Sequence, residues 1–309
     1  MYKLEAIEIQ TVSYCNSSCV VCPWHDMKGR TKLEYMSDTT WRKLLEELSV
    51  LKPKWVIPYL NNEPFIDNQM IERLHQIKTL IPTAKIEIST NGMLLTPSIA
   101  DRLSDLNIDK ILFSVFGNDR DQTHKIMGKS INYEQVCKNI LYLNQVLKER
   151  RSTTSLSVVK LTGLEDAGLN IGKAQDNSFW TDNGISIEKY SFVNRSGLIQ
   201  SKQQRNIQIQ PEGCDFNRHL DRTYIFHNGN VSFCCHDWLQ NHIVGNINTS
   251  SLDDILHSRE YNLKRLQVAG LEDSKKDFLC RPCYHCVASQ KKSINNILDI
   301  QKMYQNQKD

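Results

Sequence analysis

Three cysteines stand close together near the start of the chain, as Cys15, Cys19 and Cys22. This C-x3-C-x2-C spacing allows a compact loop to direct three thiolates at one metal centre. Three ligands cannot satisfy all four irons of a cubane cluster, so one iron would stay open to a substrate or cofactor. The alternative is a zinc site completed by His25, although zinc ligands usually come as a C-x2-C pair with a distant second pair.

A second group of cysteines lies in the last third of the chain. A set with C-x19-C…C-x2-C spacing offers the four thiolates that a complete cubane cluster needs. Its members are Cys214, Cys234, Cys280 and Cys283. Cys286 could replace Cys283 as a ligand, and Cys235 could join the set. The alternative is a zinc ribbon in which four cysteines hold the metal.

The composition is that of an ordinary globular protein of 309 residues. Lys+Arg (38) and Asp+Glu (35) nearly balance, and a net charge of +3 argues against a dedicated nucleic-acid or membrane-surface protein. The N-terminus has no apolar run of signal-peptide length, and no stretch approaches the roughly 18 apolar residues of a membrane span. We therefore expect a cytoplasmic protein, in which clustered cysteines bind metal or act in redox chemistry.

Strand-like and helix-like segments alternate over the first two thirds of the chain. Strands are expected at 6–12, 55–60, 85–89, 110–115, 155–160 and 185–192. The helices between them include 38–51 with Ser37 as N-cap, one opened by Thr96-Pro97, and one with Val136, Ile140 and a buried Cys137 on its apolar face. Such alternation implies parallel strands, and six units suit an open sheet or a partial barrel with ligands at the C-terminal strand ends.

The sequence changes in character after residue 200. Residues 203–210 are polar and are expected to form an exposed linker. Residues 224–235 are expected to form a hairpin around Asn228-Gly229, and 251–268 a helix. The predicted organisation is an α/β partial barrel over 1–200, a cysteine-rich extension over 201–289 and a helical tail over 290–309.

The first cysteine loop, placed directly after the first strand, resembles that of the radical S-adenosylmethionine (SAM) superfamily. In that family such a loop in a partial (β/α)6 barrel holds a [4Fe-4S] cluster, which implies Cys15, Cys19 and Cys22 as ligands. The open iron binds SAM, and one electron cleaves SAM to a 5′-deoxyadenosyl radical that abstracts hydrogen from a C–H bond. The usual aromatic residue before the third cysteine is Val21 here, which weakens a contact near the adenine and leaves the ligation intact.

Further motifs fall at the ends of the expected strands. Asn61-Asn62-Glu63-Pro64 resembles the family's Gly-Gly-Glu-Pro, which implies that Asn62 and Glu63 contact SAM and that Glu63 accepts a hydrogen bond from the SAM ammonium. Asparagine tolerates a left-handed backbone better than other non-glycine residues, so the turn is expected to survive. The resemblance also implies SAM contacts for Thr90 and Asn91 of Thr90-Asn91-Gly92, for Ser114, and for Asn194 of Asn194-Arg195-Ser196-Gly197.

The C-terminal cysteines resemble the SPASM extension of radical SAM enzymes, or its shortened twitch form. Gly229-x4-Cys234-Cys235-His236-Asp237 is followed by Gly245-Asn246-Ile247, by a helix and by Cys280-Arg281-Pro282-Cys283. Because further cysteines of the full pattern are missing, the resemblance implies one auxiliary [4Fe-4S] cluster. Its expected ligands are Cys214, Cys234, Cys280 and Cys283.

The sequence indicates catalytic residues less clearly than it indicates cluster ligands. Glu188 and Tyr190, with Arg195 just beyond, belong to the sixth expected strand, which should face the barrel mouth. Asp237 follows the auxiliary cysteines and can take a proton during an oxidation. Cys235 can donate a hydrogen atom to a substrate radical, as epimerising members of the superfamily require, or can be a structural neighbour of the cluster.

The resemblance predicts a radical SAM enzyme with SAM and two [4Fe-4S] clusters, served by a flavodoxin- or ferredoxin-type electron donor. The expected substrate is a ribosomally made peptide that is cross-linked, epimerised or cleaved, since this is the commoner use of the extension. Because the barrel starts by residue 6, a peptide enzyme would need a separate recognition protein or direct leader contact. The alternative substrate is a sugar or aminocyclitol that is dehydrogenated or epimerised. A non-catalytic zinc or iron–sulfur binding protein is a third alternative, and neither a nucleic acid nor a membrane is expected as partner.

Overall fold

The computed structural model of the chain describes residues 4–170, 177–202, 209–283 and 285–286, together with Lys302 and Gln305. Apart from these last two residues, the predicted helical tail over 290–309 lies outside the described residues, as does most of the linker predicted over 203–210. Within the described ranges, no helix is both long enough and apolar enough to span a membrane.

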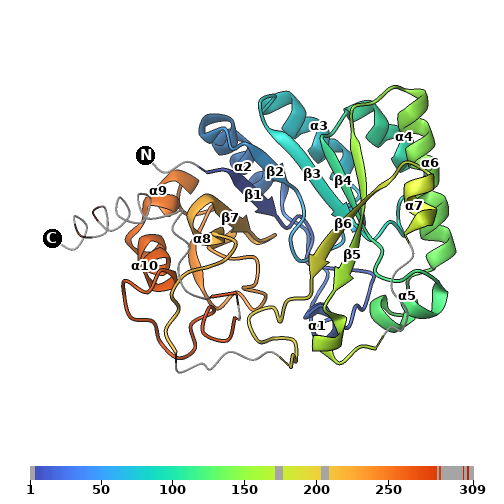
Figure 1. Cartoon of the computed structure of the whole chain (residues 1–309). Helices are drawn as coiled ribbons and strands as arrows, with labels where there is room; N and C mark the ends of the chain where they lie inside the picture. The colour runs from blue at the N-terminus through green and yellow to red at the C-terminus, as the bar shows by residue number, and fades with distance from the viewer. Residues whose placement is uncertain are drawn as a thin grey trace.

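Nine strands of the described chain form one sheet with the order β6-β5-β4-β3-β2-β1-β7-β8-β9 (Figure 1). They are β1 (Ala6–Ile9), β2 (Trp55–Ile57), β3 (Lys85–Thr90), β4 (Lys110–Ser114), β5 (Ser155–Thr162), β6 (Ser186–Ser191), β7 (Arg222–Ile225), β8 (Asn230–Ser232) and β9 (Ile243–Asn246). The first six lie in sequence order, and each pairs in parallel with the next. The predicted α/β partial barrel is confirmed.

Four long helices pack beside one another along the outer face of the barrel (Figure 1). They are α2 (Asp38–Leu51), α3 (Met70–Leu80), α4 (Pro97–Leu106) and α6 (Tyr133–Glu149). Ser37 caps α2 by accepting a hydrogen bond from Thr40 N, as predicted. Thr96-Pro97 opens α4 as predicted, and Thr96 is its cap, accepting from Ile99 N. Shorter helices are α1 (Trp24–Met27), α5 (Arg120–Met127) and α7 (Ser178–Asp182).

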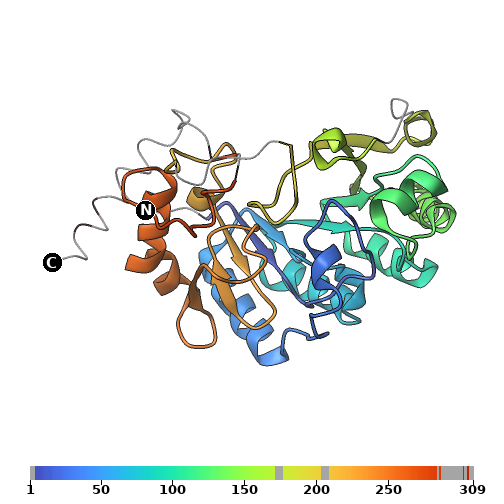
Figure 2. The same cartoon turned by 90° about the horizontal axis from the view of Figure 1, so that it is seen from below.

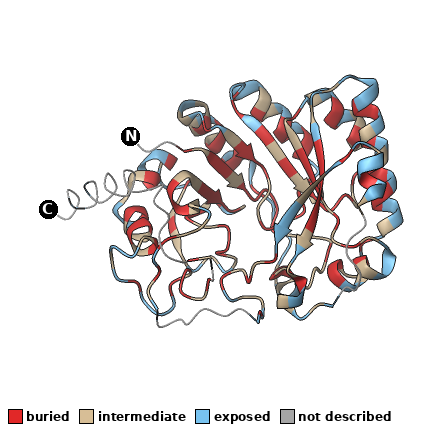
Figure 3. Ribbon diagram, viewed as in Figure 1, coloured by how far each residue is buried: buried red, intermediate tan, exposed pale blue. Residues whose placement is uncertain are grey.

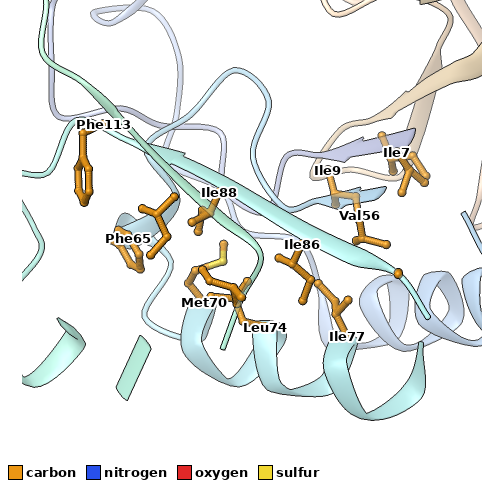
Figure 4. Close-up of a cluster of buried hydrophobic side chains, with 14 of the residues drawn as sticks. Ile7, Ile9, Val56, Phe65, Met70, Leu74, Ile77, Ile86, Ile88 and Phe113 are labelled. Atoms are coloured by element: carbon orange, nitrogen blue, oxygen red, sulfur yellow. The ribbon is translucent and has the colours of Figure 1, made fainter. Parts of the chain in front are cut away.

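Alternation along the strands decides which side chains enter the core between sheet and helices. Ile86 and Ile88 of β3 point to the outer face of the barrel (Figure 4). Met70 and Ile77 of α3 lie against them there, in one buried apolar cluster (Figure 4). Because successive side chains of a strand point to opposite faces, Glu87 points to the inner face. The outer face is therefore core, and the inner face is free to carry polar groups.

The sheet continues across the domain boundary predicted near residue 200. β7 pairs in parallel with β1, with Tyr224 opposite Glu8, so β1 has a strand on each side. β7 and β8 form the predicted hairpin, in which Gly229 has φ +84° and a Cβ would come within 2.4 Å of Asn248 Nδ2. The C-terminal elements thus lie beside the barrel and share backbone hydrogen bonds with it (Figure 2).

Two helical segments differ from the predicted elements. The helix predicted over 251–268 is split into α9 (Leu252–His257) and α10 (Arg259–Val268). Ser258 between them is extended (φ −63°, ψ 152°), and its side chain caps α10 by accepting from Tyr261 N. The sequence pattern did not predict α5, a short helix capped by Asp119.

A buried ion pair braces the turn after β2. Arg73 Nε donates to Asp67 Oδ2 (2.8 Å), and each side chain is 1% exposed. We expect Asp67→Ala to lower the free energy of unfolding by about 3–5 kcal/mol, because the buried guanidinium would lose its counter-charge. Asp105→Ala is the control, since Asp105 pairs with Arg150 at the surface and should cost less than about 1 kcal/mol. Equal losses in chemical denaturation would contradict this prediction.

Candidate functional site

The first cysteine loop follows β1 and is closed by its own hydrogen bonds. Cys22 N donates to Cys19 O (3.0 Å), and the Ser17 hydroxyl lies 3.0 Å from the Cys19 sulfur. Burial and then the neighbouring Cys22 raise the pKa of Cys19 to about 12, and burial and Glu63 raise the pKa of Cys15. A metal centre would bind these groups as thiolates and release their protons, which would offset the effect of burial on the three thiols.

Helix α5 supports the cysteine loop from outside. Ser18 N donates to Met127 O at the C-terminal end of α5 (3.1 Å), and Ser17 Oγ donates to the same carbonyl (2.8 Å). Val20 N donates to Ile126 O (2.9 Å). Since α5 was not predicted, this support was missed. The Asp119 cap at its start is the one local signal that could have revealed it.

His25, the fourth ligand of the alternative zinc site, contacts the backbone of the cysteine loop. It is exposed, and its Nδ1 lies 3.0 Å from Ser18 O. Within the described ranges, no three His, Cys, Asp or Glu side chains are placed to hold a single metal ion. Three thiols from one loop match the ligands of a cubane, each of which binds a separate iron.

Glu63 joins the motifs at the ends of β2 and β3. Its Oε1 accepts from Thr90 Oγ1 (2.6 Å), and its Oε2 accepts from Asn91 N (2.8 Å). Asn91 Nδ2 donates in turn to Asn16 Oδ1 in the cysteine loop (2.7 Å). Burial raises the pKa of Glu63 to about 7, although the hydrogen bonds from Asn91 and Thr90 lower it. The structure thus brings three of the sequence motifs to one place, around one buried carboxyl group.

Two of the other predicted SAM contacts have buried atoms without a partner among the described residues. Asn62 Oδ1 accepts from Leu60 N (3.0 Å), whereas Asn62 Nδ2 is unpartnered. Asn194 Nδ2 donates to Pro282 O (3.0 Å), whereas Asn194 Oδ1 is unpartnered. A buried polar atom without a hydrogen bond is costly, so these two atoms fit contacts to a bound ligand.

The backbone of the Asn61-Asn62 turn differs from the expectation. Neither asparagine has a positive φ, so a left-handed residue is not what replaces the glycines of the family motif. Instead, the hydrogen bond from Leu60 N to the Asn62 side chain closes the turn. Left-handed residues occur in the motif after β6, where φ is 48° at Arg195, 56° at Ser196 and 83° at Gly197.

The inner face of the barrel carries a chain of hydrogen bonds from the end of β2 to β6. Tyr59 OH donates to Glu87 Oε1 (3.0 Å). Lys110 Nζ lies 3.4 Å from Glu87 Oε2 and 3.0 Å from Glu188 Oε1. Tyr190 OH donates to Glu188 Oε2 (3.0 Å). We call Tyr59, Glu87, Lys110, Glu188 and Tyr190 the inner-face network; it unites the predicted Glu188 and Tyr190 with three residues that the sequence analysis missed.

The charges of the inner-face network stabilise one another. Partial burial opposes the ionisation of Glu188, but hydrogen bonds from Lys110 and Tyr190 lower its pKa below the usual value. Burial likewise opposes the charge of Lys110, and the two carboxylates outweigh it and raise the Lys110 pKa. The network is reachable from solvent, because β6 is an edge strand that is largely exposed (Figure 3).

The β1 and β7 side of the inner face carries a second group of charged side chains, separate from the inner-face network. Arg222 Nη1 lies 3.4 Å from Glu8 Oε1. Burial and then the charge of Cys235 raise the pKa of Glu8 to about 8. Burial opposes the charge of Arg218, but neighbouring acidic groups outweigh it and raise the Arg218 pKa. Tyr224 is buried, and its hydroxyl has no partner among the described residues. This side therefore brings the buried carboxyl group of Glu8 close to two arginines, Arg218 and Arg222.

Six cysteines gather where the β7–β8 hairpin meets the turns at 278–286. Cys283 N donates to Cys280 O (3.2 Å), and Cys286 N donates to Cys283 O (3.1 Å), so these three follow one another in successive turns. Cys280 lies within electrostatic reach of Cys214 and Cys234. The four predicted auxiliary ligands are thus neighbours, and Cys286, which is 1% exposed, stands with them.

Comparison with family models identifies this arrangement. The model of the radical SAM superfamily matches residues 9–167, more than half of the chain. The chain belongs to the radical SAM superfamily. A second model, that of the SPASM iron–sulfur cluster-binding domain, matches residues 214–287. The predictions of a radical SAM enzyme, of SAM with its cluster, and of an auxiliary iron–sulfur cluster are confirmed at this level.

The names of individual relatives of this radical SAM enzyme record different ligands, a cyclitol amine and a precursor peptide. The SAM-dependent 2-deoxy-scyllo-inosamine dehydrogenase of Niallia circulans is 24% identical over 297 residues, which cover 94% of this chain and 97% of that protein. The structure of BtrN in complex with AdoMet and 2-DOIA matches with a TM-score of 0.61 at 19% identity, over 94% of this chain and 98% of BtrN. Streptococcus suis SuiB bound to precursor peptide SuiA matches with a TM-score of 0.66 at 15% identity, over 92% of this chain and 70% of SuiB. These structural likenesses show a shared fold.

Two arginines stand between the cysteine groups of this radical SAM enzyme. Arg218 Nη1 lies 3.1 Å and Arg195 Nη1 lies 3.4 Å from Nε2 of His236. Burial raises the pKa of Cys22, and the charge of Arg195 opposes this effect. Arg195 therefore acts on the first cysteine loop and also contacts the histidine that follows Cys235.

Asp237 stabilises the loop after β8 through three hydrogen bonds. Its Oδ1 accepts from Asn241 N (2.9 Å), and its Oδ2 accepts from His242 N (3.1 Å) and from Ser232 Oγ (3.0 Å). The residue is 1% exposed, so the carboxylate is enclosed by its own loop. We therefore leave Asp237 out of the proposed catalytic residues, although sequence position alone had suggested it.

Lys160 of β5 holds the loop that follows Ser114. Its buried Nζ donates to Gly117 O (2.7 Å) and to Asn118 Oδ1 (2.9 Å). We expect Lys160→Met to lower the free energy of unfolding by about 1–3 kcal/mol at pH 7, because the Gly117 carbonyl loses its partner. Thermal or chemical unfolding of the two proteins measures the loss.

The same pair of proteins gives a pH test. Burial lowers the pKa of Lys160 from 10.5 to about 8. Between these values the folded protein holds a neutral amine and the unfolded chain an ammonium, so rising pH stabilises the wild type relative to Lys160→Met. A stability difference that stays constant from pH 7 to pH 10 would show that Lys160 titrates normally.

Proposed function

We propose that this radical SAM enzyme dehydrogenates a small polyol, an aminocyclitol or a sugar, at a carbon that bears a hydroxyl group. The polar inner face of the barrel carries this proposal. Charged and phenolic side chains line it on both sides, namely the inner-face network and Glu8, Arg222 and Tyr224. A ligand with many hydroxyl groups can satisfy such donors and acceptors, whereas an apolar peptide side chain would leave them unpaired.

Sequence similarity supports a polyol over a peptide. The relative whose name records a cyclitol amine as substrate aligns with nearly the whole length of both chains at 24% identity. Likeness to peptide-bound SuiB is a likeness of fold at 15% identity. The proposal therefore takes what was the alternative in the sequence analysis and sets aside the modification of a ribosomally made peptide.

The residues of the chain have separate tasks in the proposed reaction. When bound, SAM and its cluster supply the 5′-deoxyadenosyl radical that takes a hydrogen atom from the substrate. Glu63 is proposed to accept a hydrogen bond from the SAM ammonium, and Thr90 and Asn91 orient its carboxylate. The proposed cluster ligands are Cys15, Cys19 and Cys22, and the other proposed SAM contacts are Asn62, Ser114 and Asn194. Cys214, Cys234, Cys280 and Cys283 are proposed to hold an auxiliary [4Fe-4S] cluster.

Conversion of a hydroxyl-bearing carbon to a ketone removes a hydrogen atom, the hydroxyl proton and one electron. The electron needs a one-electron acceptor, which is the chemistry of an iron–sulfur cluster. For the proton, Glu8 is the proposed acceptor, because its pKa of about 8 lies near a working pH. Glu188 and Tyr190 are proposed to position the substrate.

Cys235 favours epimerisation as a second candidate function. Its charge raises the pKa values of Glu8 and Tyr224, so Cys235 lies near two side chains of the inner face. A thiol at this place can return a hydrogen atom to the opposite side of the substrate radical. The thiyl radical left behind would then take an electron and a proton, the electron coming from the proposed flavodoxin- or ferredoxin-type donor.

Anaerobic reconstitution with iron and sulfide, followed by SAM, a one-electron reductant and 2-deoxy-scyllo-inosamine, tests the proposal. Dehydrogenation yields 5′-deoxyadenosine together with a product that has lost two hydrogen atoms. Epimerisation in deuterated water would instead place one deuterium on the product carbon, and Cys235→Ala would abolish it. Failure to convert any member of a panel of aminocyclitols and sugars, despite SAM cleavage, would contradict both candidates.

A further inference from the structure

The inner-face network offers acceptors rather than donors to a ligand. The Lys110 ammonium has three N–H donors, and it lies against Glu87 and both oxygens of Glu188. The hydroxyls of Tyr59 and Tyr190 also donate into the network. A carboxylate can accept about four hydrogen bonds, so Glu87 and Glu188 keep acceptor capacity after these contacts.

The network also has an excess of negative charge. Glu87 and Glu188 face the single ammonium of Lys110, so the three together carry one negative charge. Their side chains are 18%, 26% and 25% exposed in that order, so a ligand can reach them. On the opposite side, Arg222 is paired with Glu8 and presents N–H donors (Nη1 to Glu8 Oε1, 3.4 Å). A ligand with a cationic donor at one end and neutral hydroxyls at the other would match both sides.

The network lies on the same face as a predicted SAM contact. Glu188 is opposite Val159 in the β5–β6 pairing, and Val159 is opposite Ser114 in the β4–β5 pairing. Residues opposite one another in a sheet point to the same side. A molecule held by Glu188 therefore shares the inner face with Ser114.

We propose that the substrate carries a protonated amine and that Glu188, assisted by Glu87, binds it. This inference rests on the proposed function and narrows its substrate class to amine-bearing polyols. A charge-assisted hydrogen bond from the ammonium to Glu188 would favour such a ligand over the same ring with a hydroxyl in place of the amine.

Binding of two probes to the reconstituted enzyme with SAM tests the inference. The probes are 2-deoxy-scyllo-inosamine and the same ring with a hydroxyl in place of the amine, and titration calorimetry gives both dissociation constants. We expect the wild type to prefer the amine by roughly 10- to 100-fold, the range of one hydrogen bond to a charged group. Equal affinity of the wild type for the two probes would overturn the inference.

Two variants should change this preference in opposite directions. Glu188→Gln removes the charge, so the preference should fall toward parity while binding of the hydroxyl probe changes little. Lys110→Met leaves the two carboxylates without their ammonium, so the preference should grow. A network that only stabilises the fold would weaken both probes alike in both variants. Glu188→Gln with an unchanged preference would overturn the inference even if Lys110→Met does not fold.

Tyr190→Phe is the matched control, since it removes one hydrogen bond to Glu188 and leaves every charge in place. It should keep the preference for the amine, and its loss in this variant would count against charge recognition. Turnover separates this inference from the proposed function. Equal dehydrogenation of both probes would leave the proposed function standing and overturn amine recognition, whereas SAM cleavage without binding of either probe would overturn the proposed function.

Discussion

Replacement of Cys15, Cys19 and Cys22 together by alanine should abolish SAM cleavage and halve the iron content. Two cubane clusters hold about eight irons, and loss of the first would leave about four. The second cysteine group should keep its iron, because its proposed ligands, Cys214, Cys234, Cys280 and Cys283, all lie outside the first cysteine loop. Iron and sulfide analysis together with an assay for 5′-deoxyadenosine measures both effects.

Cys137→Ala is the matched control for this experiment. Cys137 is buried on α6, 7% exposed, as predicted for a core residue. Its replacement should leave the iron content and SAM cleavage unchanged and cost only about 1 kcal/mol of stability. Formation of 5′-deoxyadenosine by the triple variant would show that the proposed ligands are wrong.

Glu63→Gln should weaken SAM binding on the order of 10- to 100-fold. Both carboxylate oxygens accept protein hydrogen bonds, one from Thr90 and the other from Asn91. A glutamine would turn an amide N–H toward one of these donors and would also lose the charge proposed to meet the SAM ammonium. Equilibrium binding of SAM to the reconstituted protein measures the change.

Glu72→Gln on the exposed face of α3 is the control and should bind SAM like the wild type. The pH dependence gives a second check. Burial raises the pKa of Glu63 to about 7, so protonation below neutral pH should weaken SAM binding in the wild type. The same fall in Glu63→Gln would assign it to another group.

The barrel could be predicted from local patterns, because its elements are coded by neighbouring residues. Apolar periodicity placed α2, and the side chain of Ser37 marked its start. The partner of β1 could not be predicted in this way. Its pairing with β7 joins segments more than 200 residues apart. The apolar pattern of a buried parallel strand does not indicate which strand it pairs with.

The candidate site could be predicted in part for the same reason. Thr90, Asn91 and Glu63 sit at strand ends, where turn motifs and function coincide, and the structure unites them. Glu87 and Lys110 look like ordinary charged residues on exposed strand positions, so the inner-face network could not be predicted from them. One signal was available: Glu87 lies between Ile86 and Ile88, so it had to point away from the apolar face.

The place of β1 between β2 and β7 has a consequence for synthesis on the ribosome. β1 is made before the other described strands, but one of its two neighbours is completed only when residue 225 has left the exit tunnel. Until then one edge of β1, with the apolar Ile7 and Ile9, stays open to other chains. The nascent barrel should therefore need chaperones to prevent aggregation during this interval. A chain truncated before β7 should be insoluble.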